Sequence, residues 1–594
     1  MKKRNKVLSF CIAVVMVCTL MFGCAPKDYK NDTNTKVPFS WDNATVYFAL
    51  TDRFFDGNKE NNHSYGRELD ASGKENADYK KQPSTYHGGD IKGITKKINE
   101  GYFNELGVNA IWITSPFEQI HGYYAGQGFR FYSYHGYYVL DYSNIDGNVG
   151  TKEEFKEFVD TAHKHGIRVV MDIVVNHAGY PTLKDMDEYG FGKLKDGWKD
   201  FYYGDPSNVT NDTYFSYMDK SDAASWGKWW SPAWVRASQR FAGYEGEESG
   251  DDKTICLSGL PDFKTETTND PGIPPLWKTK WQKEGRLEKE EKSLDDYFKK
   301  TGEKRTVSNY IIKEISDWVR EYGIDAFRCD TAKHVDLSVW KELKVQCTAA
   351  LKEWKEKNPT KKIDDKDFWM TGEIWDHKVG RTDEYDNGFD SLINFDFQGM
   401  AGNLDNLDSI YSSYAEKMHS DKFNALSYIS SHDTVLFDRD NLIEGGTELM
   451  LVPGAAQIYY GDETARPLAF EECPYKDQAL RGDMNWNSIN QKVLKHWQIL
   501  GRFRRAHISV GAGEHKKISD SPYTFSRTYD KDGIKDKVIC VIGAKNKTEV
   551  NVSSVFADGT EVRDAYTGET AKVRSGKVKF KANENGVILL EEAK

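Results

Sequence analysis

Short apolar segments alternate with amphipathic segments over most of the chain. The apolar segments have the length of strands, and the intervals between them repeat apolar residues every three or four positions, as helices packed on a sheet do. Eight segments are predicted to be strands: 45–51, 108–115, 167–175, 324–329, 368–374, 391–396, 425–431 and 456–460. Clear helical patterns lie at 152–165, 308–321, 338–355 and 405–418. Eight buried strands that alternate with helices predict an α/β fold, the (β/α)8 or TIM barrel.

Two regions depart from this alternation. The interval 178–307, between the third and fourth strands, is too long for one crossover and predicts an inserted domain. After about residue 512 only short strand-like runs occur, at 522–528, 537–543, 548–555, 561–565, 577–581 and 586–590. They predict a C-terminal antiparallel β-sandwich at 513–594. The catalytic barrel is then expected to comprise residues 38–177 and 308–512.

The N-terminal segment has the pattern of a targeting signal. Basic residues precede an apolar run at 7–22, which ends in Gly23-Cys24. This resembles a bacterial lipoprotein signal, so we expect a signal peptide at 1–23, a lipid on Cys24 and a tether at 24–37. Met21 stands where such signals usually carry Leu, and an uncleaved anchor helix is the alternative. The expected location is extracytoplasmic, either lipid-anchored to the membrane or secreted.

Composition narrows the classes of partner. The formal net charge of −11 argues against nucleic acid, which binds basic surfaces. Five of the eight cysteines lie beyond Cys24 and are widely scattered, which indicates neither a disulfide framework nor a zinc site. Aromatic residues make up 13% of the chain, which fits either a large core or platforms for sugar rings. We expect a monomer that contacts the membrane only through the lipid.

Acidic side chains follow three of the predicted strands. Asp330 and Asp433 come just after the fourth and seventh strands, and Glu373 is the penultimate residue of the fifth. The C-terminal ends of barrel strands converge on one face, where such folds carry their active sites. Ordinary salt bridges are the alternative for any one of these residues. A pair of carboxyl groups about 5–5.5 Å apart is what glycoside hydrolysis with retention of configuration requires.

Six short motifs around these residues support that chemistry. They are Asp172–His177 (DIVVNH), Phe327–His334 (FRCDTAKH), Gly372-Glu373, Ser431–Thr434 (SHDT), Leu260–Asp262 (LPD) and Tyr134–Tyr137 (YHGY). Together they resemble the signature segments of the α-amylase family of glycoside hydrolases, family 13. The segments PFEQIHG, WGKWW, GDETARP and RGDMNW are most similar to the periplasmic-type bacterial members.

The resemblance implies a catalytic role for each acid. Asp330 is expected to be the nucleophile, Glu373 the acid/base and Asp433 the group that binds the sugar 2- and 3-hydroxyls. Arg328 is expected to keep Asp330 ionised. Neighbouring anions are expected to raise the pKa of Glu373, so that it holds a proton near neutral pH.

The resemblance also implies residues that contact the substrate. They are His135, Tyr137, His177, Arg328, Lys333 and His432, and Asp172 is expected to support the floor of the site. Four tryptophans of the inserted region can be either glucan platforms or core residues, and we favour the core: Trp226, Trp229, Trp230 and Trp234.

Two Ca²⁺ sites are implied, because hard oxygen ligands suit this ion. The first comprises Asn176, Asp262 and the carbonyl group of His334, with a further ligand expected from 251–254. The second is similar to a site of cyclodextrin glycosyltransferases, and a plain Asn/Gly turn is its alternative. Its expected ligands are Asp56, Asn58, Asn61, Asn62, Asp90 and the carbonyl group of Gly88.

The expected function is retaining endo-hydrolysis of α-1,4-glucosidic bonds in starch and maltodextrins. A cyclodextrin- or pullulan-degrading or transglycosylating relative is the alternative among enzymes. Cyclodextrin glycosyltransferases normally carry further C-terminal β-domains, whereas about eighty residues follow the predicted barrel here. A non-catalytic glucan-binding lipoprotein is a remote alternative, which predicts a broken catalytic triad, whereas all three acids are present.

Overall fold

The computed structural model describes residues 38–126, 128–221, 223–238 and 248–593. The predicted signal peptide, Cys24 and the tether at 24–37 lie outside these residues. Within them, no helix has the length and apolar character needed to cross a bilayer.

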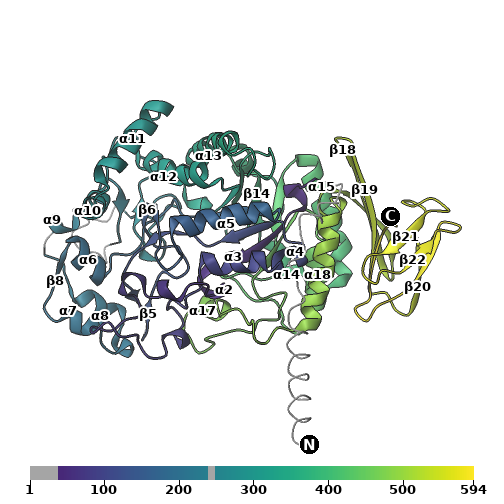
Figure 1. The fold of residues 1–594 in the computed structure, drawn as a ribbon, viewed down its shortest axis with the longest axis horizontal. Coiled ribbons are helices and arrows are strands. Elements are labelled where there is room, and N and C mark those ends of the chain that lie inside the picture. Colours follow the sequence, from purple (N-terminus) through teal and green to yellow (C-terminus); the bar gives the residue numbers. More distant parts are fainter. Residues whose placement is uncertain (1–37, 127, 222, 239–247, 594) are drawn as a thin grey trace, which may run out of the picture.

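Eight parallel strands close into a barrel at the centre of the molecule (Figure 1). Its order is β1-β16-β15-β14-β13-β12-β7-β2, closed by pairing of β1 with β2. The strands are β1 (Thr45–Ala49), β2 (Ala110–Ile113), β7 (Arg168–Ile173), β12 (Ala326–Cys329), β13 (Trp369–Gly372), β14 (Ser391–Asn394), β15 (Asn424–Ser427) and β16 (Ala455–Tyr459). All eight predicted barrel strands are confirmed. Most end before their predicted polar C-terminal residues, which leave the ladder to face the site.

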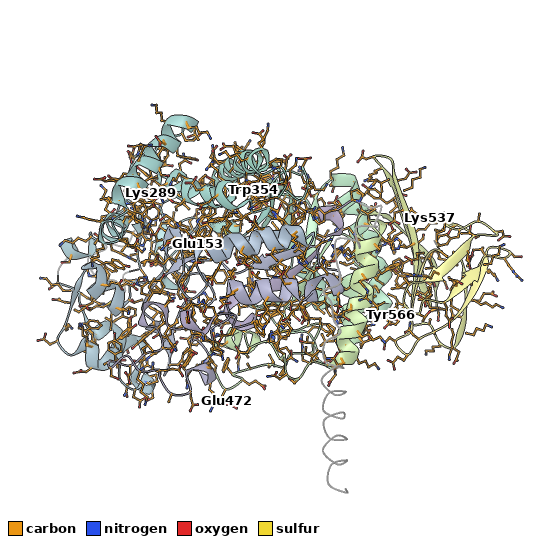
Figure 2. All side chains as sticks on the ribbon, viewed as in Figure 1. Glu153, Lys289, Trp354, Glu472, Lys537 and Tyr566 are labelled. Carbon is orange, nitrogen blue, oxygen red and sulfur yellow. The ribbon has the colours of Figure 1, made fainter. Side chains whose placement is uncertain are left out.

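Helices surround the barrel because each carries one apolar face. In α5 (Lys152–Lys164) that face contains Phe155, Phe158 and Val159, and a capping box of Thr151 and Glu154 fixes the first turn. The other long helices are α3 (Ile91–Asn99), α12 (Val307–Tyr322), α13 (Leu337–Lys357), α15 (Leu404–Asp421), α16 (Leu442–Met450) and α18 (Gln491–Ala506). Glu153 of α5 is exposed, whereas Trp354 of α13 is buried; both residues are labelled in Figure 2.

The region between β7 and β12 carries short helices and small ladders. Its helices include α6 (Leu183–Tyr189), α7 (Trp198–Tyr202), α8 (Asn211–Ser216), α10 (Pro275–Lys283) and α11 (Leu287–Thr301). The ladder β10 (Val235–Arg236) pairs with β11 (Asp262–Phe263). Trp226, Trp229, Trp230 and Trp234 are all at most 1% exposed, so the core interpretation of these tryptophans is confirmed.

A six-stranded antiparallel sheet forms the C-terminal part. It comprises β17 (Glu514–Asp520), β18 (Tyr523–Lys531), β19 (Ile534–Ile542), β24 (Val587–Glu592), β21 (Glu561–Asp564) and β22 (Thr570–Lys572), in that spatial order. The pair β20 (Lys547–Asn551) and β23 (Lys577–Lys581) buries alternate residues against a separate core that contains Val550 and Phe580. The predicted strands are confirmed, and β17 and β22 are additional.

One histidine joins the barrel to this sheet. His507, which follows α18, lies between Asp536 of β19 and Glu591 of β24, at 2.8 and 2.7 Å. Burial alone would lower the pKa of His507, but the two carboxylates raise it to about 9. The imidazolium therefore holds the last barrel helix against two strands of the sheet.

The first described residues pack on the N-terminal end of the barrel. Trp41 stacks on Trp369, the first residue of β13, with ring centroids 4.3 Å apart. The guanidinium of Arg168, the first residue of β7, lies over the ring of Phe39. Both contacts lie at the opposite ends of the strands from Asp330 and Glu373.

Candidate active site

The guanidinium of Arg328 lies among three carboxyl groups at the C-terminal face of the barrel. Its Nη1 donates to Asp330 Oδ1 at 2.8 Å and to Asp172 Oδ1 at 2.9 Å. Its Nη2 lies 2.9 Å from Glu373 Oε2. Arg328 and Asp330 point to the same side because side chains alternate along a strand. One buried cation thus brings the predicted nucleophile and the predicted acid/base together.

A second set of contacts reaches from Asp172 to Asp433. The hydroxyl group of Tyr137 donates to Asp172 Oδ2 at 3.0 Å and lies 2.7 Å from His432 Nε2. That nitrogen is also 2.9 Å from Asp433 Oδ2. The other carboxylate oxygen of Asp433 accepts from Arg481 Nη2 at 2.7 Å. The three predicted catalytic acids therefore belong to one connected polar cluster.

The acids of this cluster differ in pKa. Burial raises the pKa of Glu373 to about 7, with further increases from Asp330 and Asp433 and an opposing effect of Arg328. Burial also raises the pKa of Asp172 to about 7. For Asp433, burial is outweighed by His432 and Arg481, which hold its pKa well below the ordinary value. A carboxyl group that keeps its proton near neutral pH and one that stays ionised thus lie side by side, as the sequence predicts for Glu373.

Arg328 lowers the pKa of Asp330, as expected from the sequence, but burial opposes this effect. The pKa of Asp330 is raised, because burial outweighs Arg328 and because Asp433 adds a further negative charge. Arg328 also pairs with Asp172 and Glu373, so it is not the partner of Asp330 alone.

The other predicted substrate residues fall into two groups. His135 stacks on Tyr137, with ring centroids 5.3 Å apart, and is buried beside the cluster. His177 pairs with Asp262 through a backbone bridge, and its buried Nε2 has no hydrogen-bond partner. Lys333 instead lies at the rim, where its Nζ pairs with Asp252 at 2.8 Å. The structure therefore places Lys333 in contact with the inserted region.

The first predicted calcium ligands lie together between β7, the inserted region and the loop after β12. The amide oxygen of Asn176 faces Asp262 Oδ1 at 3.3 Å and the carbonyl oxygen of His334 at 3.1 Å. Three oxygens that face one another are stabilised by a cation, whereas a rotated amide would place its nitrogen there. The donor set is of the hard oxygen type and fits Ca²⁺.

The second predicted set also fits a cation. Asp56 Oδ1, Asn61 Oδ1 and Asn62 Oδ1 are buried without a hydrogen-bond partner. Gly88 has φ +96°, and a Cβ there would lie 2.6 Å from Asn62 Oδ1, so only glycine brings this backbone close. Asp90 caps α3 through Gly93, and the side chain of Asn58 accepts from Glu60. These last two side chains already serve local structure.

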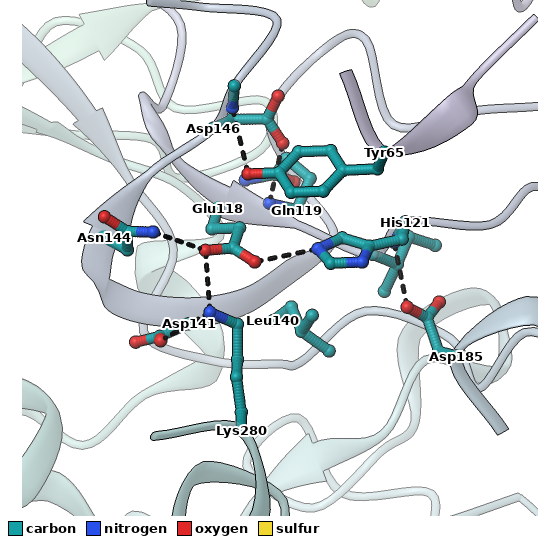
Figure 3. Close-up of polar contacts among 12 residues, drawn as sticks. Tyr65, Glu118, Gln119, His121, Leu140, Asp141, Asn144, Asp146, Asp185 and Lys280 are labelled. Atoms are coloured by element: carbon teal, nitrogen blue, oxygen red, sulfur yellow. Dashed lines mark hydrogen bonds and ion pairs between the residues drawn. The ribbon is translucent and has the colours of Figure 1, made fainter. Parts of the chain in front are cut away.

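A further group of potential ligands is His121, Asp185 and Glu188. Among them, Asp185 accepts a hydrogen bond from the backbone N–H of His121 at 3.0 Å (Figure 3). His121 Nε2 is 2.8 Å from Glu118 Oε1, and His121 Nδ1 is 2.9 Å from Glu188 Oε2. Lys280 of α10 donates to Glu118 Oε2 at 2.8 Å. The network fastens α6 and α10 of the inserted region to the segment that follows β2.

Sequence reasoning did not single out three residues beside the acids. Arg481 belongs to the RGDMNW segment, which was recognised only as a resemblance, and its position four residues after Asp477 was the available signal. Trp375 and Val435 are 60% and 49% exposed, and each follows a predicted catalytic acid by two residues. An apolar residue two positions beyond a strand-end acid was the signal for this pair.

Comparison with known proteins is consistent across sequence and structure. The family description "Alpha amylase, catalytic domain" matches residues 48–241. The chain is 41% identical over 528 residues to the periplasmic α-amylase of Escherichia coli (strain K12), which covers 85% of this chain and 73% of that protein. It is 24% identical over 576 residues to a cyclomaltodextrin glucanotransferase of Thermoanaerobacterium thermosulfurigenes, covering 94% and 67%.

Solved structures with the same fold include hydrolases and glucanotransferases. CldA, described as a cyclomaltodextrin glucanotransferase with three domains, has a TM-score of 0.60 at 21% identity, covering 93% of this chain and 99% of that chain. The α-amylase of Geobacillus thermoleovorans, complexed with acarbose, has a TM-score of 0.57 at 19% identity, covering 94% and 100%. At these identities the likeness concerns the fold.

Proposed function

The chain belongs to the α-amylase family of glycoside hydrolases, and on that premise we propose that it hydrolyses internal α-1,4-glucosidic bonds of starch and maltodextrins with retention of configuration. The single observation that carries the proposal is the guanidinium of Arg328, which bridges Asp330 and Glu373 at 2.8 and 2.9 Å. Two carboxyl groups that share one guanidinium suit the short separation of retaining enzymes, rather than the wider gap of inverting ones.

The proposed reaction has two displacements. In the first, Asp330 attacks the anomeric carbon and forms a glycosyl ester, while Glu373 gives its proton to the departing glycosidic oxygen. In the second, the Glu373 carboxylate takes a proton from water, and the water oxygen attacks the same carbon and releases Asp330. Each displacement inverts the centre, so the product keeps the α configuration. Asp433, held ionised by Arg481 and His432, is assigned to the sugar hydroxyls.

Neighbouring side chains suit a chain of glucose units. Tyr137 and His135 form a stacked pair beside the acids, and Tyr137 is assigned as the platform under the cleaved sugar. His432, His177 and His135 are assigned as partners of sugar hydroxyls. Trp375 and Val435 offer exposed apolar surface beyond Glu373 and Asp433, where the flat faces of further sugars can pack. Such a rim is consistent with cleavage within a chain.

Calcium is proposed as the resident cation. Asn176, Asp262 and the carbonyl group of His334 would hold one ion, and Asp56, Asn58, Asn61, Asn62, Asp90 and the carbonyl group of Gly88 a second. Bound there, the ions would supply positive charge that cross-links loops, a structural contribution rather than a chemical step. The first ion would tie the inserted region to the loop after Asp330.

A transglycosylating or cyclodextrin-forming enzyme is the second candidate, because cyclomaltodextrin glucanotransferases match 94% of the chain. Domain number does not separate the two, since the glucanotransferase CldA also has three domains. Sequence identity favours hydrolysis, because the chain is 41% identical to a periplasmic α-amylase and only 24% identical to the glucanotransferase.

We assign the domains as expected from the sequence: barrel at 38–177 and 308–512, inserted domain at 178–307 and C-terminal β-sandwich at 513–594. We also propose an extracytoplasmic monomer with a lipid on Cys24. The periplasmic description of the Escherichia coli relative supports the location.

The test is digestion of amylose, cyclodextrin and pullulan by residues 25–594 with excess calcium, beside the variants Asp330→Asn and Asp296→Asn. Asp296 is an exposed residue of α11 and serves as the matched control. We expect rapid shortening of amylose, lost at least about 10³-fold in Asp330→Asn alone. Cyclic products from amylose would favour the second candidate, and inactivity of the wild type on all three substrates would exclude both enzymes.

A further inference from the structure

Two adjacent residues of the inserted region, Asp252 and Lys253, bind the loop that follows Asp330. The Nζ of Lys253 donates to the carbonyl oxygens of Lys333 and Val335, both at 2.7 Å. These carbonyls flank His334 at the end of the 3-10 turn Ala332–His334. One ammonium group thereby satisfies two backbone acceptors that the turn itself leaves free.

Asp252 contacts the same loop through both its side chain and its backbone. Its carboxylate pairs with Lys333 Nζ at 2.8 Å, and its carbonyl oxygen lies 2.7 Å from His334 Nδ1. The carboxylate pair is about half exposed, and such a pair contributes little by itself. Asp252 and Lys253 together make four contacts to three consecutive residues, 333–335, and this convergence is what makes them important for the loop.

The opposite side of this loop holds Glu373. The backbone N–H of Thr331 donates to Glu373 Oε2 at 3.0 Å, and the N–H of Ala332 donates to the Glu373 carbonyl oxygen at 3.0 Å. Arg328 Nη2 approaches the same Oε2 at 2.9 Å. Since Oε2 already has two donors, the acidic proton belongs on Oε1. The Thr331 N–H thus fixes which oxygen of Glu373 faces the glycosidic bond.

The conformation of Thr331 makes this contact dependent on its surroundings. Thr331 has φ +47°, a left-handed conformation that a β-branched residue rarely adopts. Such a residue keeps its conformation only where neighbouring contacts enforce it. On one side these contacts come from Glu373, and on the other from Lys253 and Asp252.

We propose that Lys253, assisted by Asp252, is a positioning residue for the acid/base Glu373, acting through the loop 331–335. The inserted region thereby takes part in proton donation without touching the substrate. This inference rests on the proposed function and deepens it, because it names how one domain controls the protonation of the leaving group in another.

The test separates proton donation from general damage by the choice of leaving group. A sugar leaving group needs the proton of Glu373, whereas an activated aryl leaving group such as 2-chloro-4-nitrophenolate departs without it. The variant Lys253→Met is compared with wild type on maltopentaose and on 2-chloro-4-nitrophenyl α-maltotrioside, with calcium in excess. The quantity measured is kcat/KM, which reports the first displacement.

We expect kcat/KM to fall about tenfold for maltopentaose and less than twofold for the aryl glycoside. Lys253→Arg should recover most of the loss, because a guanidinium can also donate to two carbonyl groups. Lys292→Met, an exposed lysine of α11 paired with Asp296, is the matched control and should match wild type on both substrates.

Equal losses on the two substrates would assign Lys253 a general structural role and overturn the inference. Unchanged kinetics would overturn it as well. If Lys253→Met does not fold, Asp252→Ala provides the same comparison at an exposed position, with a smaller selective loss expected. Inactivity of the wild type on both substrates is a different result and would contradict the proposed function itself.

Discussion

Arg481 donates a hydrogen bond of 2.7 Å to Asp433, across 48 residues of sequence. A second donor of the same guanidinium, Nε, reaches the carbonyl oxygen of His432 at 3.0 Å. Arg481 therefore fixes both the charge and the orientation of the third acid from outside the signature motifs. Charge-assisted bonds of this type are stronger than neutral ones, so their loss should be measurable in the reaction.

Replacing Arg481 by Met is expected to lower kcat about 10- to 100-fold and to shift the acid limb of the pH profile. The sign follows from the present pKa of Asp433, which His432 and Arg481 hold below its ordinary value. Without Arg481 that pKa rises, so Asp433 becomes protonated at a higher pH and activity is lost earlier on acidification. Kinetics of amylose cleavage across pH check this, and exposed Arg502→Met is the control.

Hydrolysis is expected to decline as the pH rises through about 7. The folded pKa of Glu373 is about 7, raised by burial, and its protonated form is the one that donates to the leaving sugar. Below this pH the acid is present in full, and above it kcat/KM falls about tenfold per pH unit. An aryl glycoside measured in parallel should show no such alkaline limb. A flat profile for maltopentaose up to pH 9 would contradict the assignment of Glu373.

Removal of calcium is expected to lower the melting temperature. Both oxygen clusters stabilise the folded state only when a cation offsets the repulsion among their oxygens. Each Ca²⁺ ion that binds only the folded protein adds about 3 kcal/mol to the free energy of unfolding when free Ca²⁺ is at a hundred times its Kd. We expect EDTA to lower Tm by about 5 °C, with recovery on adding Ca²⁺. Asp56→Ala should reduce the number of bound ions from two to one in direct calcium titration. No change of Tm with EDTA would contradict both sites.

His507 is expected to make stability depend on pH at the junction between the barrel and the C-terminal sheet. Its folded pKa of about 9 exceeds the unfolded value of about 6.5, so its stabilisation is complete below pH 6.5 and is lost as the pH rises through 9. His507→Gln should lower the free energy of unfolding by about 1–3 kcal/mol at pH 6, and by less at pH 10. Urea unfolding at both pH values checks this. Exposed His419→Gln should have no effect at either.

The barrel could be predicted because its strands are continuous apolar runs and its helices have one apolar face. The strands β17 and β22 escaped prediction because they have no such signal: β17 (EHKKISD) has one apolar residue, Ile518, and is only half-buried at best. Strands like this are specified by their neighbours, which a local pattern does not contain.

The active site, like the fold, could be predicted only in part from the sequence. Asp330, Glu373 and Asp433 could be placed from strand ends and motifs, and the raised pKa of Glu373 is confirmed. The rise in the pKa of Asp330 could not be predicted, because the sequence shows the adjacent Arg328 but not the burial that opposes it. The distribution of one cation over three carboxylates, and the reach of Lys253 across 80 residues to Lys333, are properties of the folded chain.

Phe39 and Trp41 pack at the N-terminal ends of the barrel strands, opposite the catalytic acids. The chain that precedes these residues joins the molecule at one end of the strands, and the acids open at the other. With Cys24 acylated as proposed, the connection to the lipid would reach the described part of the chain at the N-terminal ends of the barrel strands. In that arrangement the catalytic acids would open on the side away from the attachment, where large polymers have access.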